Sequence, residues 1–339
     1  MPIRLQKYLF LTLTLIVFSP AALAEMPSDA DLQRVVDEAH ARFKDVKEGA
    51  NANYIPILDT VPSDLFGVVI VTREGEVFTA GDVDYRFSIQ SVSKPFTAAL
   101  VMAQQGPEAV REKIGVEPTG QPFNSKIAIE MYPSRSGNPL VNAGAIAAVS
   151  LVEAKDEDDR WRLVHDNIEG FAGSELPVLE EVYTSEIETA WSNRAIANLL
   201  YNYERLYADP EETLRVYTRH CSIGINVEDL AMMGATLANR GVNPSTGRRL
   251  LPAEHVPELL AIMAAAGFYD ESGEWMFNAG LPAKTGVGGG VVAVVPEKFA
   301  IAAFSPRLNE AGNSIRSMRA IRHIAGELGV GLYGSNPEL

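Results

Sequence analysis

The chain has 339 residues and carries 44 acidic against 29 basic side chains, which gives a formal net charge of −15. This acidic balance argues against nucleic acid and anionic membranes as partners of the folded protein. A chain of about 300 residues buries roughly three quarters of its unfolded surface, so an enzyme-sized core is possible.

The first 24 residues are predicted to be a secretory signal peptide and not part of the fold. Arg4 and Lys7 precede an apolar run at 8–18, and small residues follow up to Ala24. A membrane-spanning helix needs about 20 apolar residues, and Ser19-Pro20 interrupts the run well before that length. We therefore predict cleavage after Ala24 and export to the periplasm or the medium, with no membrane association afterwards. The mature chain then has 315 residues and a net charge of −17, because two basic residues are lost.

The apolar pattern predicts strands near both ends of the mature chain and a helical middle. Residues 31–44 have apolar positions at helical spacing. Residues 66–80 are typical of a β-hairpin with a turn at 73–75, and residues 290–304 of a second hairpin with a turn at 296–298. Further helices are predicted at 158–169, 186–203, 210–219, 227–239, 252–265 and 313–328.

Hairpins at both ends with helices between them indicate an α+β domain, in which an antiparallel sheet is flanked by helices and a helical subdomain is inserted. We expect a single domain over residues 25–339. Residues 50–87 and 280–339 are predicted to form its sheet part, and residues 88–279 its helical part. The sequence shows no internal repeat.

Ser91-Val92-Ser93-Lys94 is the first motif with chemical content. A serine three residues before a lysine on one helical turn places the hydroxyl and the amine on the same face. A serine nucleophile with a lysine base needs this arrangement, although a serine at a helix start is also a common cap. Pro95 disfavours the helical conformation at Lys94 and is tolerated only in a first turn, which places Ser91 at the N-terminus of the helix.

Lys284-Thr285-Gly286 opens a glycine-rich segment that runs to Gly290 and leads into a predicted strand. Glycines allow a backbone to approach a ligand closely, and successive amides can bind an anion, although the segment could equally be a turn. It is not a phosphate-binding P-loop, because the chain has no Gly-x-x-x-x-Gly-Lys-Ser/Thr. Ser-x-x-Lys at a helix start and Lys-Thr-Gly on a later strand together are the paired signature of the serine penicillin-recognising fold.

Cysteine and histidine usage gives little support to other chemistries. Cys221 is the only cysteine, so no intramolecular disulfide can form, and its neighbours in sequence suit a buried small hydrophobe. The adjacent His220 leaves a cysteine nucleophile open as an alternative. The five histidines lack the spacing of a metal site, so we predict no metal and no other cofactor.

Seven separated motifs occur in order along the chain. They are Phe87-Ser88-Ile89-Gln90-Ser91-Val92-Ser93-Lys94, Val141-Asn142-Ala143-Gly144-Ala145-Ile146, Tyr183-Thr184-Ser185-Glu186, Asn193-Arg194-Ala195, Cys221-Ser222-Ile223, Gly267-Phe268-Tyr269-Asp270 and Gly280-Leu281-Pro282-Ala283-Lys284-Thr285-Gly286-Val287-Gly288-Gly289-Gly290. Together they closely resemble the serine-dependent glutaminase family, from about Tyr54 to the last helix. The resemblance implies a serine β-lactamase-like fold and hydrolysis of L-glutamine to L-glutamate and ammonia.

The resemblance also implies a role for each matching residue. Ser91 would be the nucleophile and Lys94 its base, with Tyr269 near the reacting amide and the backbone amide of Val287 in the oxyanion hole. The residues assigned to the amino-acid end of the substrate are Tyr54, Asn142, Glu186, Asn193 and Tyr217. A carboxylate suits an α-amino group, and amides or hydroxyls suit an α-carboxylate. Taken singly, these residues could also be helix caps, surface residues or core packing.

The expected chemistry is acyl transfer through a γ-glutamyl ester. Lys94 must be neutral to accept the serine proton, so its pKa has to fall by about 3 units from the value of about 10.4 for free lysine. Partial burial and a second cation at Lys284 are expected to lower it.

Two alternatives remain open on the sequence. One is another exported Ser-x-x-Lys amidohydrolase, esterase or β-lactam-interacting enzyme, although no Ser-Asp-Asn or Tyr-x-Asn occurs in the expected middle segment. The other is an exported amino-acid binding protein that has lost the chemistry, although both proposed catalytic residues are present. The resemblance further implies a homodimer or homotetramer with L-glutamine as its small-molecule partner.

Overall fold

The computed structural model describes residues 26–334, so the predicted signal peptide lies outside the described residues. Within that range, no helix combines the length and the apolar character that crossing a bilayer requires.

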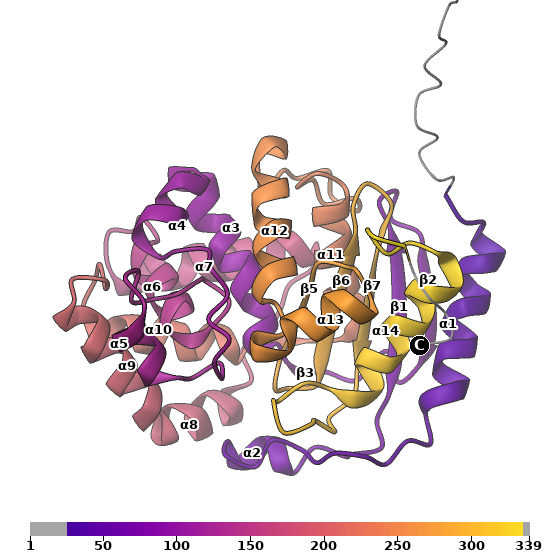
Figure 1. Ribbon diagram of the computed structural model, residues 1–339, viewed down its shortest axis with the longest axis horizontal. Coiled ribbons are helices and arrows are strands. Elements are labelled where there is room, and N and C mark those ends of the chain that lie inside the picture. Colours follow the sequence, from indigo (N-terminus) through magenta and orange to yellow (C-terminus); the bar gives the residue numbers. More distant parts are fainter. Residues whose placement is uncertain (1–25, 335–339) are drawn as a thin grey trace, which may run out of the picture.

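A five-stranded antiparallel sheet, in the order β2-β1-β7-β6-β5, forms one part of the molecule (Figure 1). Its strands are β1 (Gly67–Thr72), β2 (Val77–Gly81), β5 (Ala283–Thr285), β6 (Gly290–Val295) and β7 (Phe299–Phe304). The α+β prediction and both predicted hairpins are confirmed. β1 pairs with β7, with Val69 opposite Ala302, so strands from the two ends of the described chain lie side by side.

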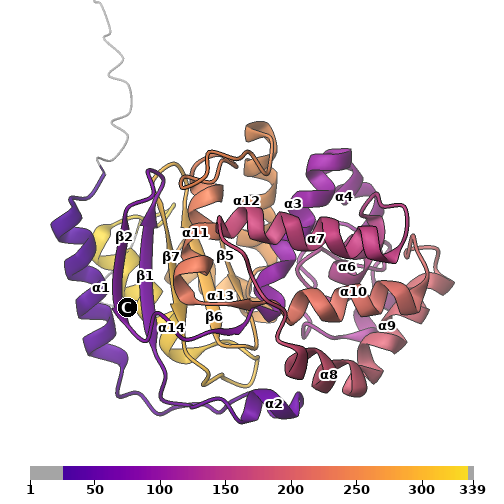
Figure 2. The ribbon, with the colours of Figure 1, turned by 180° about the vertical axis from the view of Figure 1, so that it is seen from behind.

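Helices cover both faces of this sheet. α11 (Val227–Ala238) packs on one face, and α1 (Asp29–Phe43) and α14 (Ile315–Leu328) pack together on the other (Figures 1 and 2). Val69 belongs to the core under α11, whereas its neighbour Val68 belongs to the core under α1 and α14. Because successive side chains point to opposite faces, burial on both sides explains the nearly continuous apolar sequence of the central strands.

The helical part lies beside the sheet (Figure 2). The other helices of the described chain are α2 (Pro56–Asp59), α3 (Lys94–Gln105), α4 (Pro107–Lys113), α5 (Lys126–Met131), α6 (Asn142–Leu151), α7 (Glu157–Ala172), α8 (Glu180–Thr189), α9 (Trp191–Asn202), α10 (Pro210–Cys221), α12 (Val256–Ala266) and α13 (Ser272–Asn278). The described chain also contains three 3-10 turns, η1 (Gln90–Ser93), η2 (Ala253–His255) and η3 (Tyr269–Glu271). A separate two-stranded sheet pairs β3 (Phe87–Ser88) with β4 (Gly224–Ile225).

One predicted helix is wrong in its extent. Residues 186–203 were expected to form a single helix, but α8 begins earlier, at Glu180, and ends before Ala190, where α9 takes over. Ala190 has ψ 24°, so it leaves the helical conformation and breaks the helix in two. The break allows Glu186 on α8 and Asn193 in the first turn of α9 to face the same region of the molecule.

The chain around Ser91 agrees with its predicted position but not with the predicted conformation. Ser91 lies in η1, which runs directly into the N-terminus of α3. Lys94 is helical, with φ −58° and ψ −45°, although Pro95 follows it. The bias against helix before a proline is a preference only, and the tightly packed junction of η1 with α3 overrides it. Pro95 sits in the first turn of α3, where a missing amide donor costs nothing.

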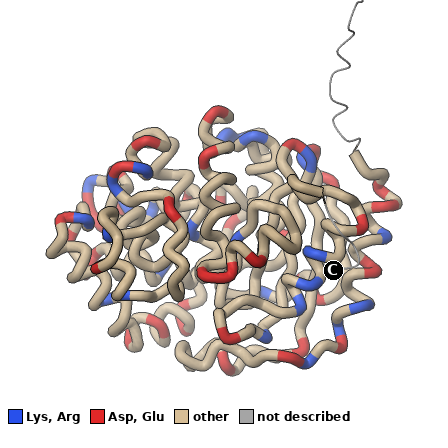
Figure 3. The backbone as a smooth tube through the Cα atoms, viewed as in Figure 1, with Lys and Arg blue, Asp and Glu red and all other residues tan. Residues whose placement is uncertain are grey.

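Acidic and basic residues are interspersed over both parts of the molecule (Figure 3). Many form exposed ion pairs, such as Arg34 with Glu38. Exposed pairs contribute little to stability, so the acidic excess chiefly favours solubility. Lys94, Lys284 and Glu186 differ from these residues, because each of them is buried.

Candidate active site

The predicted site residues converge where the sheet meets the helical part. Lys94 is only 1% exposed at the start of α3, and its Nζ donates a 2.6 Å hydrogen bond to Oδ1 of Asn142 on α6. Asn142 Nδ2 in turn donates to Oδ1 of Asn193 on α9 at 2.9 Å. Within residues 26–334, the amide nitrogen of Asn193 makes no hydrogen bond, so its donors are not used by the protein.

Burial is the main reason for the altered acidity of Lys94. It lowers the pKa of this ammonium from 10.5 to about 8, while Cys221 and Glu186 act in the opposite direction. Lys284 does not play the predicted part of a charged neighbour. Burial and repulsion from Lys94 hold the pKa of Lys284 well below its ordinary value. Desolvation, and not a second cation, is therefore the cause of the lowered pKa of Lys94.

Tyr269 lies next to the two lysines and the serine. Its hydroxyl interacts with the side chain of Ser91, which is 6% exposed, and donates a long hydrogen bond of 3.4 Å to the carbonyl of Thr285. Nζ of Lys284 is 4.0 Å from the centre of the Tyr269 ring, and Nζ of Lys94 is 5.8 Å from it. Burial raises the pKa of Tyr269, so its hydroxyl keeps its proton at neutral pH.

The glycine-rich segment packs directly on the turn that holds the serine. A Cβ atom at Gly286 would lie 2.8 Å from the side chain of Val92, so only glycine allows this approach. The side chain of Val287 is buried in a small apolar cluster with Ala52 and Leu308. Among the described residues, the backbone N–H of Val287 finds no acceptor, which leaves it available to a ligand.

Glu186 on α8 supplies a buried carboxylate to the site. Burial raises its pKa from 4.5 to about 7, opposed by a hydrogen bond from Gln90 and by the charge of Lys94. Gln90 Nε2 donates to Oε2 of Glu186 at 3.0 Å. Gln90 was not predicted as a site residue, although it directly precedes Ser91. Its φ of 47° lies in the left-handed region, which non-glycine residues seldom adopt outside constrained sites.

The two remaining tyrosines differ in exposure. Tyr217 on α10 is 2% exposed, and burial raises its pKa well above the ordinary value. Tyr54 is 50% exposed and lies at the rim, where its ring is 6.3 Å from that of Phe123. The Phe123 ring lies 5.2 Å from that of Tyr269, so Phe123 connects the rim to the interior. Phe123 was not predicted, because nothing in its local sequence distinguishes it from a core residue.

Cys221 lies behind the site and is 2% exposed, as predicted for a small buried hydrophobe. Burial raises the pKa of its thiol well above the usual range, which disfavours the thiolate that a nucleophile needs. One group of possible metal ligands, His165 with Asp166 and Glu169, lies elsewhere on α7. His165 and Glu169 are already hydrogen-bonded to the backbone of Leu176, so the loop after α7 accounts for their position.

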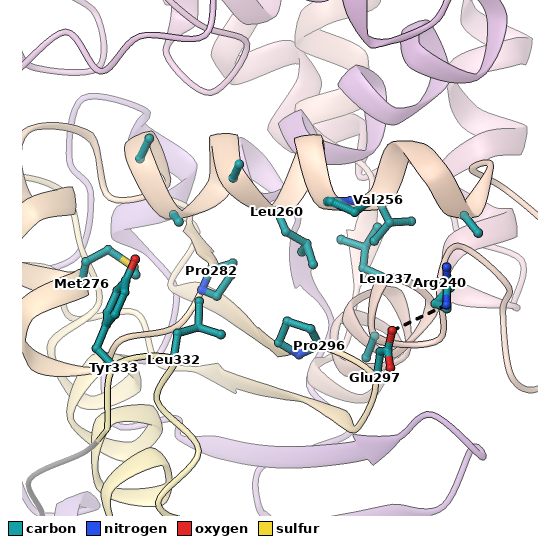
Figure 4. A pocket seen from close by; sticks show the side chains of 16 residues that line it. Leu237, Arg240, Val256, Leu260, Met276, Pro282, Pro296, Glu297, Leu332 and Tyr333 are labelled. Atoms are coloured by element: carbon teal, nitrogen blue, oxygen red, sulfur yellow. Dashed lines mark ion pairs between the residues drawn. The ribbon is translucent and has the colours of Figure 1, made fainter. Parts of the chain in front are cut away.

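An apolar groove of about 660 Å³ lies apart from these residues, between α12 and the end of the described chain (Figure 4). Leu260 on α12 faces Pro282 and Pro296 across it, and Tyr333 stands at one end. An ion pair of 3.7 Å between Arg240 and Glu297 lies at the other end. No titratable group of the site described above lines the groove.

The sheet, the serine in the turn before α3 and the Lys-Thr-Gly strand together define a protein of the serine β-lactamase-like fold class. A family model described as "Glutaminase" matches residues 49–333. The chain is 49% identical to a glutaminase of Colwellia psychrerythraea over 311 residues, which cover 92% of this chain and all of that protein. The chain belongs to the glutaminase family, and it is an amidohydrolase that converts glutamine to glutamate.

Solved structures agree with this assignment. The structure of the probable glutaminase YbaS superposes with a TM-score of 0.89 at 47% identity, covering 91% of this chain and 99% of that one. A second one is the covalent complex between the Bacillus subtilis glutaminase YbgJ and 5-oxo-L-norleucine, formed by reaction with 6-diazo-5-oxo-L-norleucine. It has a TM-score of 0.78 and 30% identity, and covers 89% of this chain and 99% of that one.

Proposed function

We propose that this glutaminase acts through a covalent intermediate, with Ser91 as the nucleophile and Lys94 as its base. The observation that carries the proposal is a lysine amine, buried one helical turn after a serine, whose pKa is lowered to about 8. The covalent complex of the relative YbgJ with 5-oxo-L-norleucine, formed by reaction of that protein with 6-diazo-5-oxo-L-norleucine, supports such a route. Family membership favours this reaction over that of a β-lactam-interacting enzyme or a binding protein.

In the first half-reaction, the Ser91 hydroxyl oxygen attacks the side-chain amide carbon of L-glutamine while Lys94 Nζ takes the hydroxyl proton. The backbone amides of Ser91 and Val287 hold the negative oxygen of the tetrahedral intermediate. The C–N bond then breaks as the leaving nitrogen receives a proton, which Tyr269 relays from Lys94. Ammonia leaves, and a γ-glutamyl ester remains on Ser91.

In the second half-reaction, water attacks the ester carbonyl, and Lys94 accepts a proton from that water. The C–O bond to Ser91 breaks, the serine oxygen regains a proton, and L-glutamate leaves. The same base thus serves both halves, because it is neutral at the start of each one.

The amino-acid end of the substrate is proposed to bind across the site from Ser91. Glu186 accepts the α-ammonium, while Asn142, Asn193 and Tyr54 offer donors to the α-carboxylate, and Tyr217 closes the inner wall. A buried, charged site of this kind suits a small zwitterion. We expect ammonia release from L-glutamine to exceed that from L-asparagine and D-glutamine, and no hydrolysis of a chromogenic β-lactam. Efficient β-lactam hydrolysis without ammonia release would contradict the proposal.

The pH dependence of kcat/KM follows from the two buried groups. Glu186, with a pKa of about 7, must be ionised to bind the ammonium, and Lys94, with a pKa of about 8, must be neutral to act as a base. Both requirements are met as pH rises, so kcat/KM is expected to increase between about pH 6 and pH 9 and to rise more steeply than a single ionisation allows below pH 7. A rate profile measured by ammonia release checks this, and a flat or falling profile over this range contradicts it.

We also propose that the protein is a homo-oligomer, and that a second copy of the chain covers the groove along α12. The groove is apolar, and the exposed aromatic side chain of Tyr333 stands at its edge, so a two-fold axis can bring Tyr333 of each copy to the groove of the other. Leu260→Glu is expected to shift the sedimentation coefficient to that of a monomer, whereas Glu274→Gln leaves it unchanged. A wild-type monomer at micromolar concentration would contradict this assembly.

Export after cleavage at Ala24 is proposed from the N-terminal pattern of charged, apolar and small residues. The N-terminal sequence of protein recovered from the periplasm or the medium is expected to begin at Glu25. Recovery of the full-length chain from the cytosol alone would overturn this proposal.

A further inference from the structure

Glu271 links two parts of the site that are distant in sequence. It is the last residue of η3, the turn that carries Tyr269. Its carboxylate accepts hydrogen bonds from Nδ2 of Asn309 at 2.9 and 3.1 Å and from Nδ2 of Asn313 at 2.5 Å. Both asparagines belong to the loop between β7 and α14, so this one carboxylate ties the Tyr269 turn to that loop.

Hydrogen bonds close the loop upon itself and attach it to the segment before Tyr54. Asn309 and Asn313 exchange two hydrogen bonds of 2.9 Å, one of them to the side-chain oxygen of Asn309. Leu308 pairs with Ala50 through two backbone hydrogen bonds of 2.8 and 3.1 Å. Ala50 belongs to the segment that leads to the exposed Tyr54. The loop is therefore tied to the part of the site where Tyr54 lies.

The same loop touches the oxyanion side of the site. A Cβ atom at Gly312 would lie 3.4 Å from the side chain of Val287 and 3.6 Å from the ring of Phe123. Phe123 in turn packs on Tyr269, with ring centres 5.2 Å apart. Leu308 of the loop shares a small apolar cluster with Val287, against which Phe123 packs, so the loop lies against both residues and reaches the Tyr269 turn through Glu271.

Tyr269 needs such support, because its backbone is in an unfavourable conformation. Its φ of 59° lies in the left-handed region, which a bulky residue keeps only where its surroundings hold it. Ser272 Oγ donates to the carbonyl of Tyr269 at 2.8 Å and holds the turn from within. Glu271 holds the same turn through its hydrogen bonds to Asn309 and Asn313.

We propose that Glu271 is a positioning residue, which holds the Tyr269 hydroxyl at Ser91 by anchoring its turn to the loop of Asn309 and Asn313. The inference rests on the proposed role of Tyr269 in proton transfer. Glu271 itself lies away from the substrate and acts through Tyr269, so its loss is expected to affect the chemical step more than substrate binding.

The first test is Glu271→Gln, which keeps the size of the side chain but replaces an acceptor oxygen with an NH₂ group that faces the asparagine donors. We expect kcat for glutamine hydrolysis to fall by about 10- to 100-fold with little change in KM. Glu274→Gln is the matched control, because Glu274 lies one helical turn away, is exposed and makes no hydrogen bond or ion pair within the described range. An unchanged kcat in folded Glu271→Gln protein would overturn the inference.

The second test repeats the substitution in a Tyr269→Phe background, where the hydroxyl to be positioned is gone. Glu271→Gln is then expected to cause no further loss of kcat, and an equal loss in both backgrounds would show a merely structural role and overturn the inference. If Tyr269→Phe alone leaves kcat unchanged, the proposed role of Tyr269 fails, and the inference fails with it. Should Glu271→Gln not fold, Asn309→Ala removes two of the three hydrogen bonds and must show the same dependence on Tyr269.

Discussion

Replacement of Ser91 by alanine is expected to lower kcat for glutamine hydrolysis by about 10⁴- to 10⁶-fold, the scale of losing a catalytic nucleophile. The physical reason is that the Ser91 hydroxyl is the proposed nucleophile, and its removal leaves nothing to form the γ-glutamyl ester beside the Lys94 amine. The Tyr269 hydroxyl stays protonated because burial raises its pKa, and burial likewise raises the pKa of the Cys221 thiol. The binding groups remain in place, so Ser91→Ala protein is expected to bind glutamine, which isothermal calorimetry can measure.

Ser93→Ala is the matched control for this variant, because Ser93 lies in the same turn and is also buried. Its hydroxyl donates to the carbonyl of Gln90 at 2.6 Å and is turned to the backbone. Its removal is therefore expected to affect stability more than turnover. If Ser91→Ala kept most of its activity, or if Ser93→Ala lost as much as Ser91→Ala, the covalent route through Ser91 would be wrong.

Replacement of Lys94 by methionine is expected to lower kcat by about 10²- to 10⁴-fold, the usual contribution of a general base. Methionine keeps much of the buried volume but cannot accept the Ser91 proton. Steady-state kinetics at saturating glutamine measures the loss. Lys126→Met serves as a control, because that exposed lysine bonds only to Ser192 among the described residues and lies outside the site.

The same variant is expected to change stability in a way that depends on pH. The pKa of Lys94 falls from 10.5 to about 8 on folding, so below pH 8 its buried charge costs about 3 kcal/mol. Between about pH 8 and 10.5 the unfolded chain binds more protons at this residue, so the wild-type protein regains stability as pH rises. Lys94→Met has no such charge. Part of its gain is offset by the buried Asn142 oxygen, which loses its donor.

The measurement is the free energy of unfolding by urea at pH 7 and at pH 10. The stability of Lys94→Met relative to the wild type is expected to fall by about 3 kcal/mol between these two pH values. A difference that does not change with pH would mean that folding does not lower the pKa of Lys94. Its proposed preparation as a base by desolvation would then be contradicted.

Much of the fold could be predicted because its signals are local. The two hairpins follow from apolar runs around short turns, and the helix 313–328 follows from helical spacing with Ile321 and Ile324 on its buried face. The helix break at Ala190 could not be predicted, because alanine is a good helix former and only tertiary packing explains its change of conformation. Tertiary packing also explains why Lys94 is helical, although the residue before a proline usually avoids the helical conformation.

The structure brings the predicted site residues together, but the sequence could not predict their electrostatics. Ser91 and Lys94 share one short motif, and the resemblance to glutaminases supplied the distant residues. The structure corrects the reason for the low pKa of Lys94, because the depth of burial is a property of the whole fold and not of a motif. Gln90 and Glu271 were missed because their partners lie far away in sequence, at separations of 96 residues for Glu186 and 38 for Asn309.

The proposed mechanism depends most directly on Ser91 as the nucleophile. The decisive measurement is mass spectrometry of peptides from the protein after incubation with 6-diazo-5-oxo-L-norleucine, with L-glutamine as a protecting competitor. We predict one 5-oxo-L-norleucine adduct on the peptide that contains Ser91, lost in Ser91→Ala protein and slowed by L-glutamine. An adduct on Cys221, Lys94 or Tyr269 that persists in Ser91→Ala protein would contradict the account.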